Sequence, residues 1–275
     1  MTVRRLLVCL LALFPGLAGA AATAFVIGVH PIHSMRTLAA RFEPMRAYLE
    51  AHLGQPVLVE SAVDFAEYHA RTLRGDFDLT ITPAHFARLA QKDKGFQPLI
   101  QFQPDNDALL VYHVDRPLEN LALLRNKQLA VIDRLAVTVM ASMHYLSEKY
   151  LEAGRDYRVV EYRNHASVAQ ALAAGLAMAG VTTTHAMKQI PEDLRDKLKV
   201  AARISDIPIF VGLAKPDLSR AEARRLQELL LVFSRGKAGQ DFLQGIAFTG
   251  FVPAEESRLR RVDAYLQETR KGLAQ

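Results

Sequence analysis

The feature that most constrains the fold is an alternation of short apolar runs with longer stretches of helical periodicity. It begins at Phe25 and continues along the chain. Residues 25–29 are rich in β-forming side chains. Residues 36–53 carry apolar side chains at helical spacing and stop at Gly54. Pro44 interrupts that stretch, so we expect a kink or a first short turn there. Such alternation predicts an α/β fold of mostly parallel sheets flanked by helices.

The number of predicted strands favours two sheets rather than one. We count roughly nine or ten strands, which is comfortable for two lobes and too many for one small sheet. No Ser/Gly-rich linker separates them, so we expect two strands to cross between the lobes, at 109–114 outward and 207–211 back. The predicted division is a signal peptide at 1–20, lobe 1 at 21–109, lobe 2 at 110–208, and the rest of lobe 1 with C-terminal helices at 209–275.

The first twenty residues have the pattern of a cleaved export signal. Arg4 and Arg5 precede an apolar run at 6–14, which is too short to span a bilayer, and small residues follow at 18–20. Cys9 is the single cysteine of the chain and lies inside this segment, with too few residues before it for a lipid-attachment site. The mature chain would therefore lack disulfides and thiol chemistry, which suits a bacterial periplasm.

Composition and motifs exclude several functions. The formal net charge is +5, two units of which come from Arg4 and Arg5, so the chain gives no indication of nucleic-acid binding. Hydrolase, nucleotide-binding and EF-hand signatures are absent from the sequence. His30 and His33 are three apart, but no third ligand is tied to them by spacing, and we predict neither a metal site nor a cofactor.

Small polar residues recur where a predicted strand gives way to a helix. Thr82, Thr138, His165 and Thr183 occupy four such turns, and His30 ends the first strand. Ligands of open α/β sheets bind beyond the carboxyl ends of the strands, where helix N-termini attract anions. The alternative is that these residues are ordinary helix caps.

Several segments, taken in order, resemble the phosphate/phosphite/phosphonate solute-binding proteins of ABC importers, which have the type II periplasmic-binding fold. The resemblance covers residues 25–266. It rests on LAARFEPMRAYL at 38–49 with LGQPV at 53–57, RGDFDL at 74–79, LALLRNKQLAV at 121–131, VAQALAAG at 168–175, SDIP at 205–208 and TGF at 249–251.

The resemblance implies a cleft between two lobes that closes on a small oxyanion. The family's phosphonate-gripping helix start matches Ala136, Val137 and Thr138, where one hydroxyl remains of the usual three. The cleft histidine matches His165, and one cleft tyrosine matches Tyr68. The acidic residue that pairs with an aminophosphonate would fall near Met178 and is absent. The resemblance therefore implies a smaller oxyanion than 2-aminoethylphosphonate, or one whose apolar substituent faces Ala136, Val137 and Met178.

These expectations describe a periplasmic, monomeric solute-binding protein that delivers its ligand to an inner-membrane ABC permease and is not an enzyme. One alternative is a soluble ligand-sensing partner of a membrane sensor kinase. Another is a periplasmic hydrolase that uses His165 with Asp133, although no spacing pairs the two. The basic residues of 255–273 predict a solvated helix face whose apolar side packs inward, rather than a docking surface.

Overall fold

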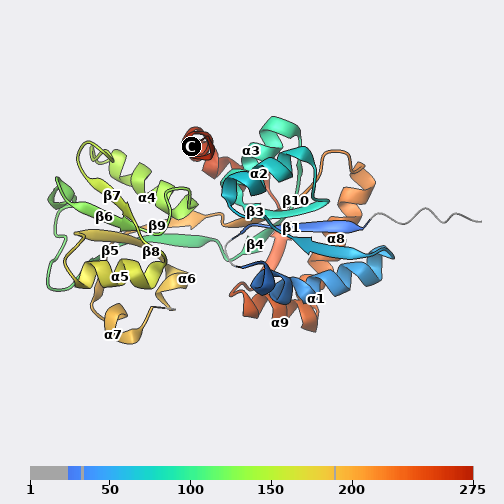
Figure 1. The fold of residues 1–275 in the computed structure, drawn as a ribbon, viewed down its shortest axis with the longest axis horizontal. Coiled ribbons are helices and arrows are strands. Elements are labelled where there is room, and N and C mark those ends of the chain that lie inside the picture. The colour runs from blue at the N-terminus through green and yellow to red at the C-terminus, as the bar shows by residue number, and fades with distance from the viewer. Residues whose placement is uncertain (1–23, 32–33, 189, 275) are drawn as a thin grey trace, which may run out of the picture.

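The computed structural model describes residues 24–31, 34–188 and 190–274, and it contains two separate sheets (Figure 1). The predicted signal peptide lies outside the described residues. The first sheet has the order β11-β4-β10-β3-β1-β2 and the second has the order β7-β6-β8-β5-β9. We call the first sheet with its helices the first lobe, and the second sheet with its helices the second lobe.

The first lobe combines parallel and antiparallel pairs. β1, β2 and β3 run parallel, whereas β10 is antiparallel to both β3 and β4. Its strands are β1 (Phe25–Val29), β2 (Val57–Glu60), β3 (Leu79–Pro83), β4 (Gln97–Gln103), β10 (Phe210–Ala214) and β11 (Gly250–Pro253). Its helices are α1 (Met35–Leu53), α2 (Phe65–Arg74), α3 (Ala84–Lys94), α8 (Arg220–Arg235) and α9 (Lys237–Gly245).

Helix α1 differs from the sequence expectation at Pro44. The helix runs without interruption through Pro44 and ends at Gly54, whose φ of 70° lies in the left-handed region that favours glycine. A continuous stripe of four buried side chains, at spacings of three and four residues, fixes the helix to the sheet on both sides of the proline: Leu38, Phe42, Met45 and Leu49. This burial offsets the hydrogen bond that proline cannot donate.

The second lobe repeats the same construction. β6 is parallel to β7 and β8, and β5 joins β8 to β9 in antiparallel fashion. Its strands are β5 (Asn106–His113), β6 (Gln128–Val131), β7 (Arg158–Glu161), β8 (Ala179–Thr183) and β9 (Leu198–Ile207). Its helices are η1 (Leu121–Leu124), α4 (Val137–Ser147), α5 (His165–Ala173), α6 (Thr184–Met187) and α7 (Glu192–Arg195).

The chain passes between the sheets twice. It leaves β4 and enters β5 through residues 104–105, and it returns from β9 to β10 through residues 208–209. The segment 109–114, expected to cross, instead lies within the second sheet, because β5 pairs with β8 from Ala108 to Val111. The predicted boundary between lobe 1 and lobe 2, at 109/110, therefore falls inside β5. We propose that the two lobes divide at the passage of residues 104–105 instead.

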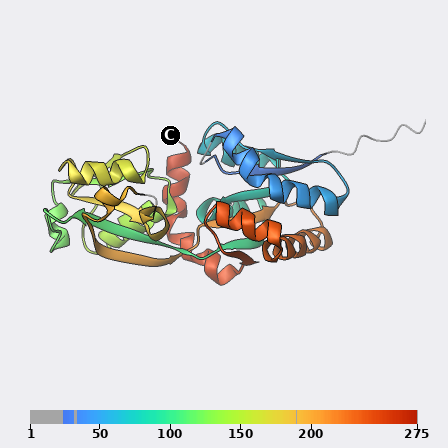
Figure 2. The same cartoon turned by 90° about the horizontal axis from the view of Figure 1, so that it is seen from below.

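The C-terminal segment is not one helix but three short ones. α10 (Glu256–Leu259), η2 (Arg260–Tyr265) and α11 (Leu266–Leu273) follow each other and turn toward the second lobe. Figures 1 and 2 both show α11 standing between the two lobes. The apolar side of the whole C-terminal segment is buried as expected, at Leu259, Val262 and Leu266. Its basic side chains form ion pairs, among them Arg258 with Asp105 and Arg270 with Asp93.

Within residues 24–31, 34–188 and 190–274, every helix is too short or too polar to span a bilayer. One apolar cluster joins the lobes on the side of α11. It takes Ala84 and Ala87 from α3, Val137 and Ala141 from α4, and Val262 from η2.

Candidate functional site

The register of the strands sets the two carboxyl edges, where the parallel strands end, opposite each other. Pro83 at the end of β3 pairs with Phe210, the first residue after the return passage. Thr183 at the end of β8 pairs with Ala108, just after the outward passage. Both carboxyl edges therefore lie beside the passages and face the other lobe. This is the place where open α/β sheets bind ligands.

One hydrogen bond joins the two edges directly. The Nε2 atom of His85, in the first turn of α3, lies 2.9 Å from the carbonyl oxygen of Leu135, in the turn before α4. Because a carbonyl only accepts, Nε2 carries the proton. Burial lowers the pKa of His85 to about 3, so the ring is neutral at physiological pH. The starts of α3 and α4 are thus held close together.

The helices that begin at these edges share an unusual first turn. α1, α3, α4, α5 and the short α6 carry no acidic residue there. By contrast, α7, α8, α10 and α11, which begin elsewhere, each carry one or two. Two helices break the pattern: α2 has Glu67 in its first turn, and α9, away from the edges, has no acid.

No first-turn carboxylate offsets the partial positive charge at the starts of α1, α3, α4 and α5. Side-chain carboxylates normally stabilise the partial positive charge of a helix N-terminus. In addition, α3 and α4 begin at Pro83 and Ala136 without any side-chain cap. The arrangement can accept an anion from outside the protein where other helices of this chain use their own carboxylates.

The predicted residues of the first lobe form a buried aromatic cluster. The His30 ring stacks on Phe65 with centroids 4.4 Å apart, and Tyr68 meets its edge at 5.4 Å. Burial, helped by the neighbouring His85 and His69, holds the pKa of His30 well below its ordinary value. The Tyr68 hydroxyl donates to the Ile81 carbonyl at 3.0 Å. In this arrangement Tyr68 supports His30 rather than offering a free hydroxyl.

The predicted threonines differ in what they can offer a ligand. Thr82 is buried within β3, beside Val211 of β10. The Thr183 hydroxyl accepts from the Ala186 N–H at 3.0 Å and so caps α6, as the alternative explanation of these turns expects. Thr138, in the first turn of α4, is 7% exposed, and its carbonyl accepts from Ser142. Of the three threonines, Thr138 stands nearest the uncapped start of α4.

His165 opens α5 and is oriented by its own lobe. Its Nδ1 atom lies 3.2 Å from the Thr182 hydroxyl, and burial, with His185 nearby, lowers its pKa to about 4. Asp133 accepts instead from the Leu135 N–H at 2.7 Å, and burial raises its pKa. Within the described residues these two side chains therefore have separate partners, and the geometry offers no support for the hydrolase alternative.

Ala136, Val137 and Met178, which were expected to face one apolar substituent of the ligand, lie in different surroundings. Ala136 is half-buried at the start of α4, whereas Val137 is buried in the apolar cluster between the lobes. Met178 lies at the opposite end of the second sheet, because its N–H bonds to Gln128 at the beginning of β6. A substituent facing Ala136 would thus not reach Met178, and that part of the expectation is wrong.

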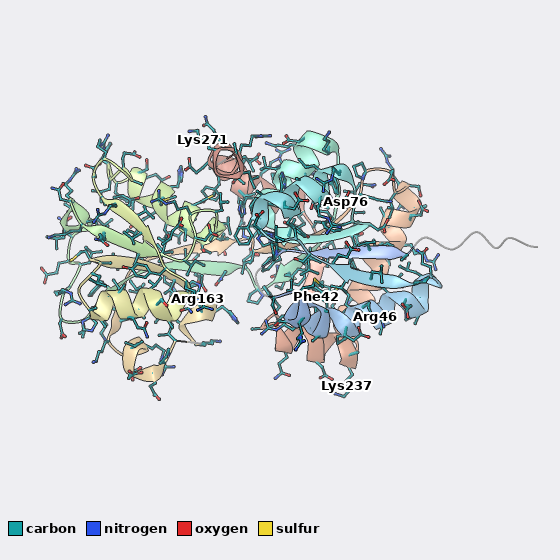
Figure 3. The ribbon with its side chains drawn as sticks, in the orientation of Figure 1. Phe42, Arg46, Asp76, Arg163, Lys237 and Lys271 are labelled. Atoms are coloured by element: carbon teal, nitrogen blue, oxygen red, sulfur yellow. The ribbon has the colours of Figure 1, made fainter. Side chains whose placement is uncertain are left out.

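The structure adds polar residues that the sequence argument missed. Arg163 is exposed in the turn before α5, on the side of the second lobe that faces the first (Figure 3), and it has no ion pair or hydrogen bond among the described residues. Asp107 forms an ion pair with Arg203 and accepts from the Thr184 hydroxyl at 3.2 Å. The sequence could have indicated Arg163, because it lies two residues before His165, in the same predicted turn between a strand and a helix.

The described residues contain no group of three or more His, Cys, Asp or Glu side chains arranged to hold a metal ion. Of two surface hollows, one lies beside the return passage, where Pro208 lines it. It is also lined by Ser205, Arg261 and Tyr265, whereas the other is lined by Asn120, Arg125 and Lys149. Neither contains a predicted ligand residue.

Comparisons with known proteins agree on fold and family. Residues 27–259 match the family described as ABC transporter, phosphonate, periplasmic substrate-binding protein. A Xanthomonas citri protein, XAC2383, solved bound to ATP, is 18% identical with a TM-score of 0.78, over 91% of this chain and 99% of that one. PhnD1 from Prochlorococcus marinus, solved in complex with methylphosphonate, is 14% identical with a TM-score of 0.72, over 90% of this chain and 98% of that one.

A binding-protein component of an ABC phosphonate transporter from Pseudomonas aeruginosa is 16% identical with a TM-score of 0.71, over 91% of this chain and 88% of that one. At such identities the structures show a common fold, and the family match covers most of the chain. The chain has the type II periplasmic-binding-protein fold and belongs to the periplasmic substrate-binding proteins of phosphonate ABC transporters.

Proposed function

We propose that this protein binds a small oxyanion of the phosphonate type between its two carboxyl edges and delivers it, as a monomer, to an ABC permease. The observation that carries the proposal is the absence of acidic residues from the first turns of α1, α3, α4 and α5. The N–H groups and dipoles of these helices favour a negative charge. Arg163 adds a full positive charge without a protein partner among the described residues.

The carboxylates near the site argue against a ligand with an ammonium group. Asp107 is already paired with Arg203, and Asp133 accepts from the backbone of Leu135. An ammonium group brought between the edges would be desolvated without a free carboxylate beside it, which is costly. We therefore propose that methylphosphonate, phosphite or phosphate is preferred over 2-aminoethylphosphonate.

Thermal unfolding in a phosphate-free buffer tests the proposal with phosphate, phosphite, methylphosphonate, 2-aminoethylphosphonate and a neutral solute of similar size. An anion at a hundred times its dissociation constant should stabilise the folded protein by about 2.7 kcal/mol. The effect should be lost with His165→Ala and weakened with Thr138→Val. Micromolar binding of 2-aminoethylphosphonate would contradict the specificity, and no stabilisation by any anion would contradict the oxyanion itself.

A further inference from the structure

The C-terminal segment 256–273 makes contacts that a simple surface helix does not make. It lies almost entirely beyond residue 259, where the family match ends. It is anchored on the first lobe through Arg88 of α3, which is buried. The guanidinium of Arg88 donates to Asp263 at 2.7 Å and forms an ion pair with Glu256 at 2.8 Å.

From this anchor the segment reaches the second lobe. Thr269 of α11 is fully buried, and its hydroxyl lies 3.6 Å from the Met140 sulfur of α4. The Tyr265 ring meets the edge of the His144 ring, also on α4, at 6.0 Å. Figure 2 shows α11 in the space between the lobes, and Figure 3 labels its Lys271 on the outer side.

At the end of α11, Gly272 packs against Leu135. A Cβ atom placed on Gly272 would lie 2.2 Å from the Leu135 Cδ2 atom and 3.2 Å from its Cγ atom, so only glycine permits the present approach. Glycine inside a helix costs up to about 1 kcal/mol relative to alanine, and here that cost coincides with a close contact.

Leu135 is consequently fixed from three directions. Its carbonyl accepts from His85 of the first lobe at 2.9 Å, and its N–H donates to Asp133 at 2.7 Å. Its side chain lies against Gly272. Leu135 directly precedes Ala136, at which α4 begins without a side-chain cap. The direction of the first N–H groups of α4 therefore depends on where these three contacts place Leu135.

We propose that α11 is a positioning element for the anion site, acting through Gly272 on Leu135 and so on the first turn of α4. The role at the ligand rests on the function proposed above, whereas the role in ordering the turn does not. Sites need their donors held to within about half an ångström by surrounding contacts, and the turn at Leu135 has such contacts from the first-lobe side. Gly272 and His85 supply these contacts.

The test introduces a side chain at Gly272 and then removes its obstacle. Rotation of the Leu135 side chain could make room for the methyl group of an alanine at position 272. We therefore choose the larger change, Gly272→Val. We expect methylphosphonate to bind about tenfold more weakly, the loss that corresponds to about one hydrogen bond to a charged oxygen. Gly272→Val with Leu135→Ala should recover most of the affinity. Gly245→Val is the matched control, because a Cβ atom at Gly245 meets nothing within 4 Å.

A second readout uses no ligand. Hydrogen exchange in the free protein should become faster for the amides of 135–140 in Gly272→Val, return toward wild type in the double variant, and stay unchanged in Gly245→Val. Unchanged exchange in a folded Gly272→Val protein would overturn the proposal, as would a double variant as weak as the single one. If neither methylphosphonate nor phosphite nor phosphate binds the wild type, the proposed function fails, while the exchange result still decides the positioning role.

Discussion

Arg163 has an exposed guanidinium group in the turn that leads into α5, and a nearby acidic residue already has another partner. Glu161, two residues earlier, pairs with Arg134 at 3.3 Å. Arg163 itself has no ion pair or hydrogen bond among the described residues. An unpaired charge beside a helix start without acids is well placed to meet a ligand anion.

Replacing Arg163 should therefore weaken anion binding without harming the fold. We expect Arg163→Gln to raise the dissociation constant for methylphosphonate about tenfold to a hundredfold, because a charge-assisted hydrogen bond contributes roughly 1.5–3 kcal/mol. Calorimetric titration at two salt concentrations measures the effect, which should be larger at low salt. The control is Arg224→Gln on α8, which is also exposed and distant from the site. Equal affinities for the two variants would exclude Arg163 from the site.

Individual residues show which parts of the site the sequence can reveal. His165 was predictable because it follows a β-rich run and begins a helical pattern, and local order alone places it at a carboxyl edge. The partner of the Tyr68 hydroxyl was not predictable, because the Ile81 carbonyl comes to it only through the packing of α2 on β3. The bond between His85 and Leu135 joins residues 50 positions apart in two lobes and leaves no local signal.

Among the elements, the first turn of α4 carries the sharpest conflict between stability and binding. Its N-cap residue, Ala136, has extended backbone angles suited to a capping side chain and yet offers none. A capping residue here would stabilise the helix by about 1 kcal/mol relative to alanine. A binding protein that uses this helix start for an anion has a reason to leave it uncapped.

Ala136→Asp should separate the two effects. The carboxylate should raise the free energy of unfolding by about 1 kcal/mol through capping. It should also weaken methylphosphonate binding about a hundredfold or more, because it occupies the N–H groups and repels the ligand. Gly236→Asp, at the similarly uncapped start of α9, should leave the affinity unchanged. Urea unfolding and calorimetry give both quantities, and undiminished binding in Ala136→Asp would remove α4 from the site.

Element order was largely predictable, whereas element boundaries near the passages were not. Periodicity located the strands that become β1, β3, β6 and β8, since each is a short apolar run before a helical pattern. The outward passage was misplaced because β5 continues the same extended, apolar pattern on both sides of the expected crossing. The C-terminal segment read as one helix because its apolar spacing persists through η2, where the backbone tightens to follow the surface of α3.

At the scale of the whole molecule, the two lobes are joined by more than their two passages. The apolar cluster shared by α3, α4 and η2 joins the lobes on one side, and the ion pair of Arg88 with Asp263 fixes the C-terminal segment to α3. The buried histidines His30, His69 and His85 lie near one another: burial lowers the pKa of His30 and His85, His69 adds to the lowering at both, and His85 adds to it at His30.

These histidines make the stability of the whole protein depend on pH. Burial lowers the pKa of His69 to about 4 and that of His85 to about 3, while both ionise near 6.5 in the unfolded chain. Asp93 acts against the shift at His69, and Arg270 acts with it. Below pH 6.5 these two histidines therefore bind protons in the unfolded state and stay neutral in the folded state. The stabilisation is complete above about pH 7 and is lost as the pH falls toward 4.

Each such histidine should contribute a slope of up to about 1.4 kcal/mol per pH unit between pH 6 and pH 4.5, a window above the range in which ion-paired carboxylates titrate. Urea unfolding at pH 7.5, 6.0, 5.2 and 4.5 in phosphate-free buffer gives the total slope. His69→Gln should reduce it by close to one histidine's share, because glutamine has no proton to gain. If His69→Gln kept the full wild-type slope of unfolding free energy against pH, proton uptake by His69 on unfolding would not be a cause of the acid sensitivity.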